Sequence, residues 1–340
     1  MGKVVVTGAT GRLGANVVKA LVERGDAVRC LVMPKDLAAS KLAAFDIEVF
    51  EADLRDADRL REAVRSVDKV CHFATLMDEV PEGMSNVEYF DINTRGSYAL
   101  MDAAQAEGVE KFVYTSSTSV YDVTTVREVP TREDAPLRPH SEYGITKVAA
   151  EAALMAMSFH YDLPLIILRP SYIMAADQVL VLGAPGNAIF GLKAATDPHS
   201  SFYVPDLGEP WKEVEEKAKA NPDLSVIPYG PGRVPWQWHV TDVRDCVQAV
   251  LLSLDTDAVE CDIFNLAGPP PRPFDEVVKY KCEKLGTPYE EVHTPVTWRL
   301  EFDVTKAREL LGYEPEYDVF RMIDDAIAFR KGEDIGVNPA

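Results

Sequence analysis

Lys3-Val-Val-Val-Thr7-Gly8-Ala-Thr-Gly11-Arg12-Leu13-Gly14 is the stretch that decides the fold. Its first five residues form a short, apolar, β-branched run that is typical of a buried strand, and an amphipathic pattern follows the glycines as far as Gly25. Glycines between a strand and a helix permit a tight turn and a close backbone approach to a pyrophosphate, while the helix N-terminus offers N–H donors. The alternative is an ordinary glycine turn. Because strand and helix flank it, we predict a dinucleotide site that includes Gly8, Gly11, Arg12, Leu13 and Gly14.

The alternation of strand and helix continues along the first half of the chain. We expect further strands at residues 28–33, 47–51, 69–73 and 111–115 and a buried strand at 164–168, with helices between them. This order predicts an α/β protein with a Rossmann-type doubly wound parallel sheet, followed by a smaller C-terminal α/β substrate lobe. We place a dinucleotide-binding domain at 1–170 and a mainly substrate-binding lobe at 171–340, although later strands of such folds often return to the first sheet. Within the lobe, residues 210–219 form an amphipathic helical pattern.

Tyr143 and Lys147 are the first candidates for chemistry. They lie four residues apart, on one face of a helix for which Ser141 is the expected N-cap. An ammonium near a phenol favours the phenolate and lowers its pKa from the usual value of about 10. The pair could therefore exchange a proton with a carbinol oxygen, which is half of a hydride transfer. Taken alone, a surface tyrosine and lysine explain the spacing equally simply.

Small and hydroxyl side chains follow two of the expected strands. Ser117 and Thr118 lie just after the strand at 111–115, where ligands bind in doubly wound sheets, and Ser117 could hydrogen-bond a reacting oxygen. A polar strand-to-loop turn is the simpler reading of these hydroxyls. Ala74, after the strand at 69–73, leaves space for a dinucleotide. His72 within that strand is expected to be a packed core histidine.

The end of the second strand bears on the choice of cofactor. An acidic residue there would bind an adenosine ribose, and a basic residue would accept a 2′-phosphate, but this chain has Met33. Arg12 in the glycine loop and Lys35 beyond the strand could supply positive charge, although both could equally be solvated surface residues. The cofactor is therefore expected to be NAD or NADP, with a slight preference for NADP.

Composition restricts the classes of partner. The formal net charge of −20 argues against nucleic acid and anionic membranes, because phosphates would be repelled. The five cysteines are scattered without a Cys-x-x-Cys pair, which favours reduced thiols over disulfides. No apolar run has membrane-spanning length, and the first strand begins directly after Met1-Gly2, where a signal peptide would have no room. We expect a cytoplasmic protein with a small-molecule substrate and no metal ion.

Nearly the whole chain resembles the extended short-chain dehydrogenase/reductases, also called the NAD-dependent epimerase/dehydratase family. Each motif is weak alone, but the ordered set is specific. The matching residues are Thr7 to Gly14, Asp53-Leu54, Asn93-Thr-Arg-Gly96, Tyr114-Thr-Ser-Ser117-Thr-Ser-Val-Tyr121, Tyr143-Gly-Ile-Thr-Lys147, Leu168-Arg-Pro170, His239-Val-Thr-Asp242-Val, Phe264-Asn265-Leu, Asp303-Val-Thr-Lys306-Ala and Glu309-Leu-Leu-Gly312-Tyr-Glu-Pro315.

The resemblance implies a role for each matched position. Ser117 would polarise the substrate oxygen, Tyr143 would be the acid/base, and Lys147 would lower the pKa of the tyrosine and hold the nicotinamide ribose. The glycines would hold the pyrophosphate, Asp53 and Leu54 would flank the adenine, and Pro170 is also expected at the cofactor. Family members commonly dimerise through a four-helix interface, which the Tyr143 helix and the helix before Gly108 could form, so we expect a homodimer.

Three departures from the family pattern concern the substrate. Tyr172 stands where nucleotide-sugar epimerases usually carry asparagine, and Pro235 stands where they place an arginine for the diphosphate, although Arg233 is near. Thr118-Ser119 replaces the Asp-Glu pair of sugar dehydratases, which argues against dehydratase chemistry. The aromatics Tyr172, Trp211, Trp236, Trp238 and Trp298 could form an apolar or carbohydrate-stacking pocket, or could be core. We expect substrate contacts from Thr118, Tyr172, Arg233 and Trp236.

The sequence thus predicts an NAD(P)-dependent oxidoreductase that transfers a hydride at a secondary alcohol or ketone of a small molecule through Ser117, Tyr143 and Lys147. The alternative is a sugar 4-epimerase, acting on a nucleotide sugar, that keeps NAD tightly bound and returns the hydride to the other face. A third reading, a catalytically dead cofactor-binding regulator, conflicts with the intact set of catalytic residues.

Overall fold

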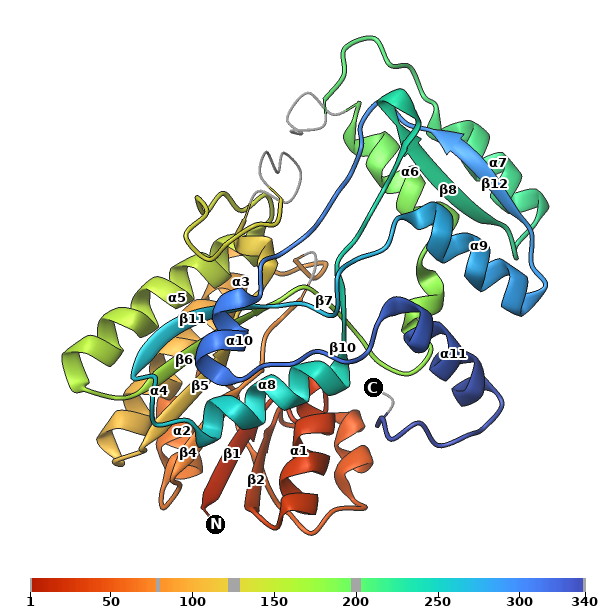
Figure 1. Cartoon of the computed structure of the whole chain (residues 1–340). Helices are drawn as coiled ribbons and strands as arrows, with labels where there is room; N and C mark the ends of the chain where they lie inside the picture. The colour runs from red at the N-terminus through yellow and green to blue at the C-terminus, as the bar shows by residue number, and fades with distance from the viewer. Residues whose placement is uncertain (1, 78–79, 122–128, 197–202, 339–340) are drawn as a thin grey trace.

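A seven-stranded parallel sheet forms the centre of the molecule (Figure 1). The computed structural model describes residues 2–77, 80–121, 129–196 and 203–338. The strands lie in the order β3-β2-β1-β4-β5-β6-β11, which confirms the predicted Rossmann-type doubly wound fold. Their bounds are β1 Lys3–Thr7, β2 Ala27–Val32, β3 Glu48–Glu51, β4 Lys69–His72, β5 Lys111–Thr115, β6 Leu165–Pro170 and β11 Cys261–Leu266.

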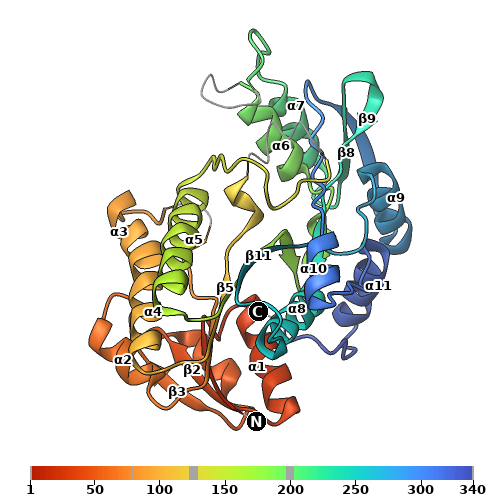
Figure 2. The same ribbon diagram turned by 60° about the vertical axis from the view of Figure 1, so that its left-hand side comes forward.

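Helices cover both faces of this sheet (Figures 1 and 2). One face is covered by α1 (Arg12–Arg24), α8 (Val243–Asp255) and α10 (Thr305–Leu311), and the other by α2 (Ala57–Val64), α4 (Gly96–Ala106) and α5 (Glu142–Tyr161). Within β1, Val4 and Val6 pack into the core beneath α1 and α8, whereas Val5 packs into the core beneath α4 and α5. Burial on both faces explains why β1, β5 and β6 are largely continuous apolar runs instead of alternating ones, whereas the edge strand β3 is mostly exposed.

Local capping fixes the two helices that carry most of the candidate site. The αL conformation of Gly25, with φ of 86°, ends α1 as predicted, because glycine adopts positive φ without strain. The Ser141 side chain accepts a hydrogen bond from the Gly144 N–H and begins α5, also as predicted. The helical region before α4 is not regular. It consists of α3 (Asn86–Phe90) and a π-helical turn, η2 (Asp91–Arg95), which the sequence pattern did not indicate.

The second half of the chain builds the smaller lobe and also contributes to the main sheet. The lobe contains a two-stranded sheet, β10-β7, and a three-stranded sheet, β12-β8-β9. Its elements and the remaining short helices are β7 Tyr172–Met174, α6 Pro185–Ala194, α7 Trp211–Ala220, β8 Ser225–Gly230, β9 Val234–Pro235, β10 Val240–Asp242, α9 Phe274–Leu285, β12 Tyr289–His293, α11 Val319–Arg330, η1 Leu37–Leu42, η3 Thr118–Val120, η4 Gln178–Val181 and η5 Pro231–Arg233. The division of the chain at residue 170 remains a proposal, and β11, α8 and α10 belong to the main sheet and its cover.

One segment of the lobe joins two short strands without being part of either. The residues from Trp236 to His239 lie between β9, which ends at Pro235, and β10, which starts at Val240. Between them the chain changes partners: the Trp236 N–H donates to Pro228 O, whereas the Gln237 N–H donates to Trp298 O. Two successive residues thus pair with two different segments, and no regular ladder forms.

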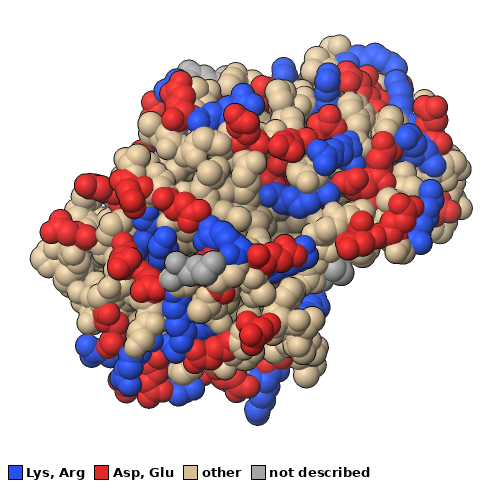
Figure 3. All heavy atoms as spheres, turned by 60° about the horizontal axis from the view of Figure 1, so that its bottom comes forward, with Lys and Arg blue, Asp and Glu red and all other residues tan. Residues whose placement is uncertain are grey.

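The surface is mixed in charge despite the net charge of −20. On the face shown in Figure 3, acidic and basic side chains are interspersed. Among the described residues, no helix is both long enough and apolar enough to cross a membrane.

Candidate active site

Lys147 lies at the centre of the candidate active site. Its side chain projects from α5 into the protein, it is only 2% exposed, and its Nζ donates a 2.8 Å hydrogen bond to the carbonyl oxygen of Thr115 at the end of β5. The same ammonium lies 5.6 Å from the ring centroid of Tyr143 and 4.7 Å from that of Tyr114. Lys147 therefore holds the first turns of α5 against the carboxyl end of β5, with Tyr143 next to the charge.

Burial changes the proton affinity of this lysine. Loss of solvation lowers the pKa of Lys147 to about 7, while the negative charge of Glu151, one helical turn further along α5, opposes the shift. An ammonium with a pKa near neutrality can both stabilise a neighbouring phenolate and exchange its proton at physiological pH.

The turn after β5 brings Ser117 to the same place. Ser117 caps η3, accepts a hydrogen bond from the Ser119 N–H at 3.0 Å and donates to Ser119 Oγ at 3.1 Å. This turn packs against the first turn of α5 so closely that a Cβ on Gly144 would lie 2.5 Å from the carbonyl oxygen of Ser119. Glycine at 144 therefore permits the approach. The structure brings the predicted Ser117, Tyr143 and Lys147 together at one sheet edge.

The glycine loop has the shape that a dinucleotide needs. Gly8 has a φ of +65°, and a Cβ there would lie 2.7 Å from the backbone nitrogen of Ala74, whereas a Cβ on Gly14 would lie 2.1 Å from Gly8 O. Gly11 is the N-cap of α1 without a side-chain cap, and the first turn contains no acidic residue. The backbone thus forms a cradle without side chains at the positive end of a helix dipole, which fits a pyrophosphate.

The other residues predicted at the cofactor are placed in different ways. The Arg12 guanidinium does not point outward but donates to Ile173 O at 2.6 Å, and Lys35 is exposed. Asp53 pairs with Arg55 at 2.6 Å, and this hydrogen bond lowers the pKa of its carboxyl group. Leu54 is buried and packs against Gly96. A Cβ added at Gly96 would lie 2.8 Å from the Cβ of Leu54. Pro170 ends β6 and is buried.

His72 is a core residue, as expected. It is fully buried, and its ring nitrogens lie 2.7 Å from Thr7 Oγ1 and 2.8 Å from Ser97 Oγ. Burial, and to a smaller extent the positive charge of Lys147, lower its pKa to about 3, so the ring is neutral. Because Ser97 Oγ donates to Asn93 O, it accepts from the ring, which assigns the proton to Nε2 and leaves Nδ1 to accept from Thr7.

Asn93 belongs to the site and was not assigned a role from the sequence. Its amide accepts from the Leu76 N–H at 2.8 Å and donates to Leu76 O at 2.9 Å, which fixes the segment after β4. It also donates to Thr146 Oγ1 on α5 at 3.2 Å. Asn93 lies in the π-helical turn η2, a feature frequent at functional sites but without a recognisable sequence pattern.

Asp36 is a second residue that the sequence reasoning missed. Its carboxylate accepts hydrogen bonds from Thr10 Oγ1 in the glycine loop at 2.7 Å and from the Ala38 N–H at 2.9 Å. The turn Met33–Asp36, closed by a bond from the Asp36 N–H to Met33 O, carries this carboxylate back toward the loop. Its position four residues beyond the strand end, instead of directly after it, hid it from the sequence reading.

The four residues expected to contact substrate are not equivalent. Trp236 is 0% exposed, and its indole N–H bonds to Thr294 and Val296, so it is a core residue, contrary to the expectation. Arg233 pairs with Glu291 at 2.6 Å within the lobe, and Thr118 is buried. Tyr172 is 44% exposed and stacks on Trp238 with a centroid distance of 5.2 Å and an angle of 6° between the rings. Tyr172 is therefore the member of the four that presents an aromatic surface.

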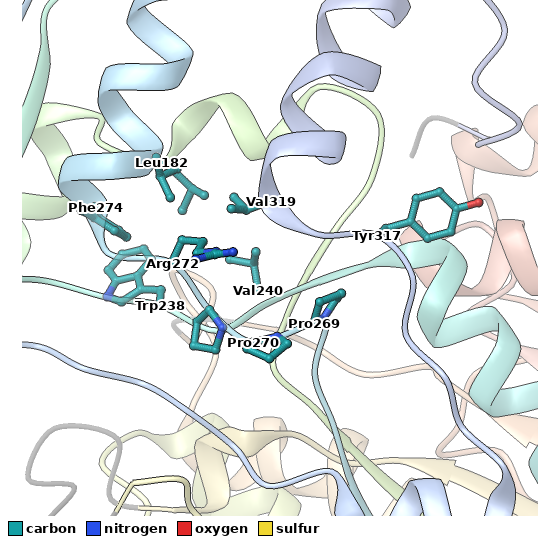
Figure 4. Close-up of a pocket in the computed structure, with 11 residues that line it drawn as sticks. Leu182, Trp238, Val240, Pro269, Pro270, Arg272, Phe274, Tyr317 and Val319 are labelled. Carbon is teal, nitrogen blue, oxygen red and sulfur yellow. The ribbon is translucent and has the colours of Figure 1, made fainter.

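A small cavity in the lobe is a separate feature (Figure 4). It is lined mainly by apolar side chains between α9 and α11, and it contains none of the predicted catalytic residues. The lining residues are Leu182, Trp238, Val240, Pro269, Pro270, Pro271, Arg272, Phe274, Val277, Tyr317 and Val319.

Comparison with known proteins agrees with this geometry. Residues 4–181 match the model of the NAD dependent epimerase/dehydratase family, a region that contains the glycine loop, Ser117, Tyr143 and Lys147. The chain belongs to this family. The match confirms the resemblance seen in the sequence and identifies the chain as a member of an enzyme family.

Individual members of this family resemble the chain over different lengths. The UDP-glucose 4-epimerase of Streptomyces lividans is 26% identical over 96% of this chain and 95% of its own length. A 3 beta-hydroxysteroid dehydrogenase/Delta 5-->4-isomerase of Mycobacterium tuberculosis is 35% identical over 61% of this chain and 58% of its own length. A short-chain dehydrogenase/reductase superfamily protein from Agrobacterium tumefaciens, solved with bound NAD, superposes with a TM-score of 0.81 and 26% identity over 97% of each chain.

Replacing Lys147 should reveal how much its burial lowers the free energy of unfolding. The folded-state pKa of about 7 lies below the usual lysine value, so the unfolded chain binds the proton more tightly between these values, and wild-type stability rises with pH above 7. Lys147→Met removes the charge at similar length. The difference in free energy of unfolding, variant minus wild type, should favour the variant most at pH 6. This difference should fall by roughly 2 kcal/mol between pH 6 and pH 9, because wild type becomes more stable over that range.

Urea unfolding at several pH values measures this difference. Lys279→Met, at an exposed position on α9, is the control and should give a nearly constant difference. A Lys147→Met difference that does not change with pH would show that the lysine is not held in a charge-disfavouring environment.

Proposed function

We propose that this family member is an oxidoreductase that transfers a hydride between a nicotinamide cofactor and a secondary alcohol or ketone of a small molecule. The observation that carries the proposal is the buried Lys147 ammonium, bonded to Thr115 O and adjacent to the Tyr143 ring, beside the Ser117 turn. Charge, phenol and hydroxyl meet at the carboxyl edge of the sheet, where doubly wound folds bind their ligands.

In the direction of alcohol oxidation, each side chain has one task. The nicotinamide, when bound, supplies the hydride acceptor. The Lys147 ammonium favours the phenolate of Tyr143, which takes the proton of the substrate hydroxyl. The Ser117 hydroxyl hydrogen-bonds the same oxygen and holds it in place as its charge changes. The bond to Thr115 O fixes the ammonium, so its position does not depend on the substrate.

For the cofactor we propose NAD and withdraw the slight preference for NADP. Arg12, one of the two cations behind that preference, has its guanidinium on Ile173 O. Asp36, bonded to Thr10 of the glycine loop, instead puts a carboxylate beside the loop, where it can accept from a ribose hydroxyl and would repel a 2′-phosphate. The NAD bound to the Agrobacterium tumefaciens neighbour supports the same choice.

A sugar 4-epimerase is the second candidate, favoured by the whole-length match to the Streptomyces lividans enzyme. It would use the same three catalytic residues. Against it, Pro235 replaces the expected diphosphate arginine, and Arg233 is paired with Glu291. The exposed Tyr172, stacked on the buried Trp238, offers an aromatic surface that suits an apolar ring system. The partial match to the hydroxysteroid dehydrogenase supports a substrate of that kind.

We further propose a homodimer formed through α4 and α5. The exposed faces of these helices carry large apolar side chains, including Tyr98, Ile145 and Phe159. Ile145 and Phe159 lie fourteen residues apart on α5, close to four full turns, so they share one side of the helix. Apolar side chains aligned on one side of a helix are suited to a helix–helix interface.

Tyr143→Phe tests the mechanism. Loss of the phenolic oxygen removes the proton acceptor, so turnover should fall by roughly two to four orders of magnitude, whereas the dissociation constant of NAD should change little. Steady-state oxidation of a panel of secondary alcohols and NAD titration measure the two effects. Turnover equal to wild type would remove Tyr143 from the mechanism.

The purified wild-type protein can be used to decide between an oxidoreductase and an epimerase. An oxidoreductase exchanges free cofactor and shows net NADH formation at 340 nm, a wavelength chosen because only the reduced nicotinamide absorbs there. Stoichiometric NAD retained through purification, without net redox in the presence of free cofactor, would support the epimerase instead.

Asp36→Asn tests the choice of cofactor. The amide keeps the shape, its oxygen can accept from the Ala38 N–H and its NH2 can donate to Thr10 Oγ1, but it removes the charge that repels a 2′-phosphate. The ratio of the dissociation constants for NADP and NAD should therefore fall by about tenfold or more. Lys35→Gln is the control and should raise that ratio only slightly. Wild-type protein that binds NADP more tightly than NAD would contradict the proposal.

Phe159→Glu tests the dimer. A charge on this 68% exposed side chain should convert the protein to a monomer if α5 is the interface, whereas Phe190→Glu, at a 61% exposed position on α6, should leave the mass unchanged. Light scattering at micromolar concentration measures both. A monomeric wild-type protein would refute the homodimer.

A further inference from the structure

The segment that follows α11 returns to α1, the helix that begins at the glycine loop. Asn16 of α1 accepts a hydrogen bond from the Asn338 N–H at 2.7 Å and donates to Asn338 O at 3.0 Å. It also donates to Arg12 O at 2.8 Å, and it is only 5% exposed. The side-chain amide of Asn16 thus makes two hydrogen bonds, one accepted and one donated, with the backbone of a residue 322 positions away.

Residues 333–338, which we name the strap, are also held at other points. Val337 is buried in the core beneath α1 and α8, and Ile335 packs against the same core. Ile335 O accepts from the Arg244 guanidinium at 3.2 Å, at the start of α8. In Figure 1 the chain returns from α11 toward α1 and α8. The strap therefore closes the seam between these helices at the end nearest the glycine loop.

The same arginine fastens the strap to the lobe. Arg244 bonds to Asp325 of α11 at 2.7 Å, and its guanidinium lies 3.6 Å from the ring centroid of Tyr317. The Arg321 guanidinium lies 3.9 Å from the same centroid. A tyrosine in contact with two guanidinium groups joins the start of α8 to the start of α11. The strap is thus anchored at both of its ends.

The first turns of α1 are consequently tied from two directions. The Arg12 guanidinium is bonded to Ile173 O of β7, and Asn16, one turn later, is bonded to the strap. Between these ties lies the part of α1 whose N–H groups face the glycine cradle. α1 itself has no side-chain N-cap, so its start depends on these tertiary contacts.

We propose that Asn16 and the strap are positioning elements that hold α1 for the cofactor and thereby set the affinity for NAD. The inference rests on the proposed function, because it requires NAD at the glycine loop. A site that is correctly formed in only a fraction of molecules binds with an affinity reduced by that fraction. Preorganisation by the strap raises this fraction without any contact between strap and ligand.

Two changes in the full chain remove the same contact from opposite sides. Asn16→Ala deletes the side-chain amide of Asn16, and Asn338→Pro deletes the backbone N–H that donates to Asn16 Oδ1. Each should weaken NAD binding by about 5- to 10-fold in calorimetric titration, the loss expected for one or two hydrogen bonds. The ratio of the NAD dissociation constants of Asn338→Pro and Asn338→Ala isolates the effect of the backbone N–H donor, because the alanine variant retains this N–H. Asn187→Ala, at a half-buried asparagine on α6 that donates to Val181 O, is the matched control.

Kinetics and a double variant distinguish positioning from general instability. KM for NAD should rise while kcat at saturating NAD stays within about twofold, since bound NAD restores the geometry of α1. Asn16→Ala combined with Asn338→Pro should bind NAD no more weakly than Asn16→Ala alone, because Asn16→Ala already removes the bond that Asn338→Pro deletes. Circular dichroism melting without NAD reports whether each variant is folded.

The outcomes are separable. Folded variants that bind NAD as tightly as wild type, or losses that add in the double variant, would overturn the strap proposal and leave the proposed function intact. A wild-type protein that binds no NAD would overturn the proposed cofactor together with the inference that depends on it.

Discussion

The hydrogen bond from Lys147 Nζ to Thr115 O is the interaction on which the rest of the site depends. A buried ammonium is costly unless polar groups and aromatic faces surround it, and here a carbonyl oxygen and the rings of Tyr143 and Tyr114 do so. If α5 slid or rotated by one residue, the charge would lose these partners. The register between α5 and β5 is therefore fixed by the same group that tunes Tyr143, so stability and catalytic geometry have one physical origin.

A second buried network holds the other side of α5. Arg169 of β6 makes a bidentate pair with Glu151 at 2.9 and 2.6 Å and donates to the Tyr121 hydroxyl at 2.7 Å. That hydroxyl donates in turn to Asn265 Oδ1 of β11, also at 2.7 Å. Asn265 lies in β11, a strand of the main sheet that comes from the second half of the chain. The second half of the chain therefore supports α5 through this network.

Local features were predictable from the sequence and long-range ones were not. The strand at Lys3–Thr7, the glycine loop, the end of α1 at Gly25 and the cap at Ser141 all depend on neighbours within a few residues. Asp36, Asn93 and the strap were missed because their partners, Thr10, Leu76 and Asn16, are far away in the chain. Trp236 and Tyr172 look alike in sequence, and only the packing of the lobe decides that one is core and the other exposed.

Strand β7 connects the two selective properties of the enzyme. Tyr172 turns its ring to Trp238 on the lobe side, while the carbonyl of the next residue, Ile173, receives the Arg12 guanidinium from the glycine loop. With the side chain of Tyr172 and the carbonyl oxygen of Ile173, this short strand contacts the lobe and the glycine loop at once. Its pairing with β10 leads directly to Asp242, the N-cap of α8, and so to Arg244 and the strap. The backbone of β7 therefore joins the exposed Tyr172 to both ties of α1, the Arg12 bond and the strap.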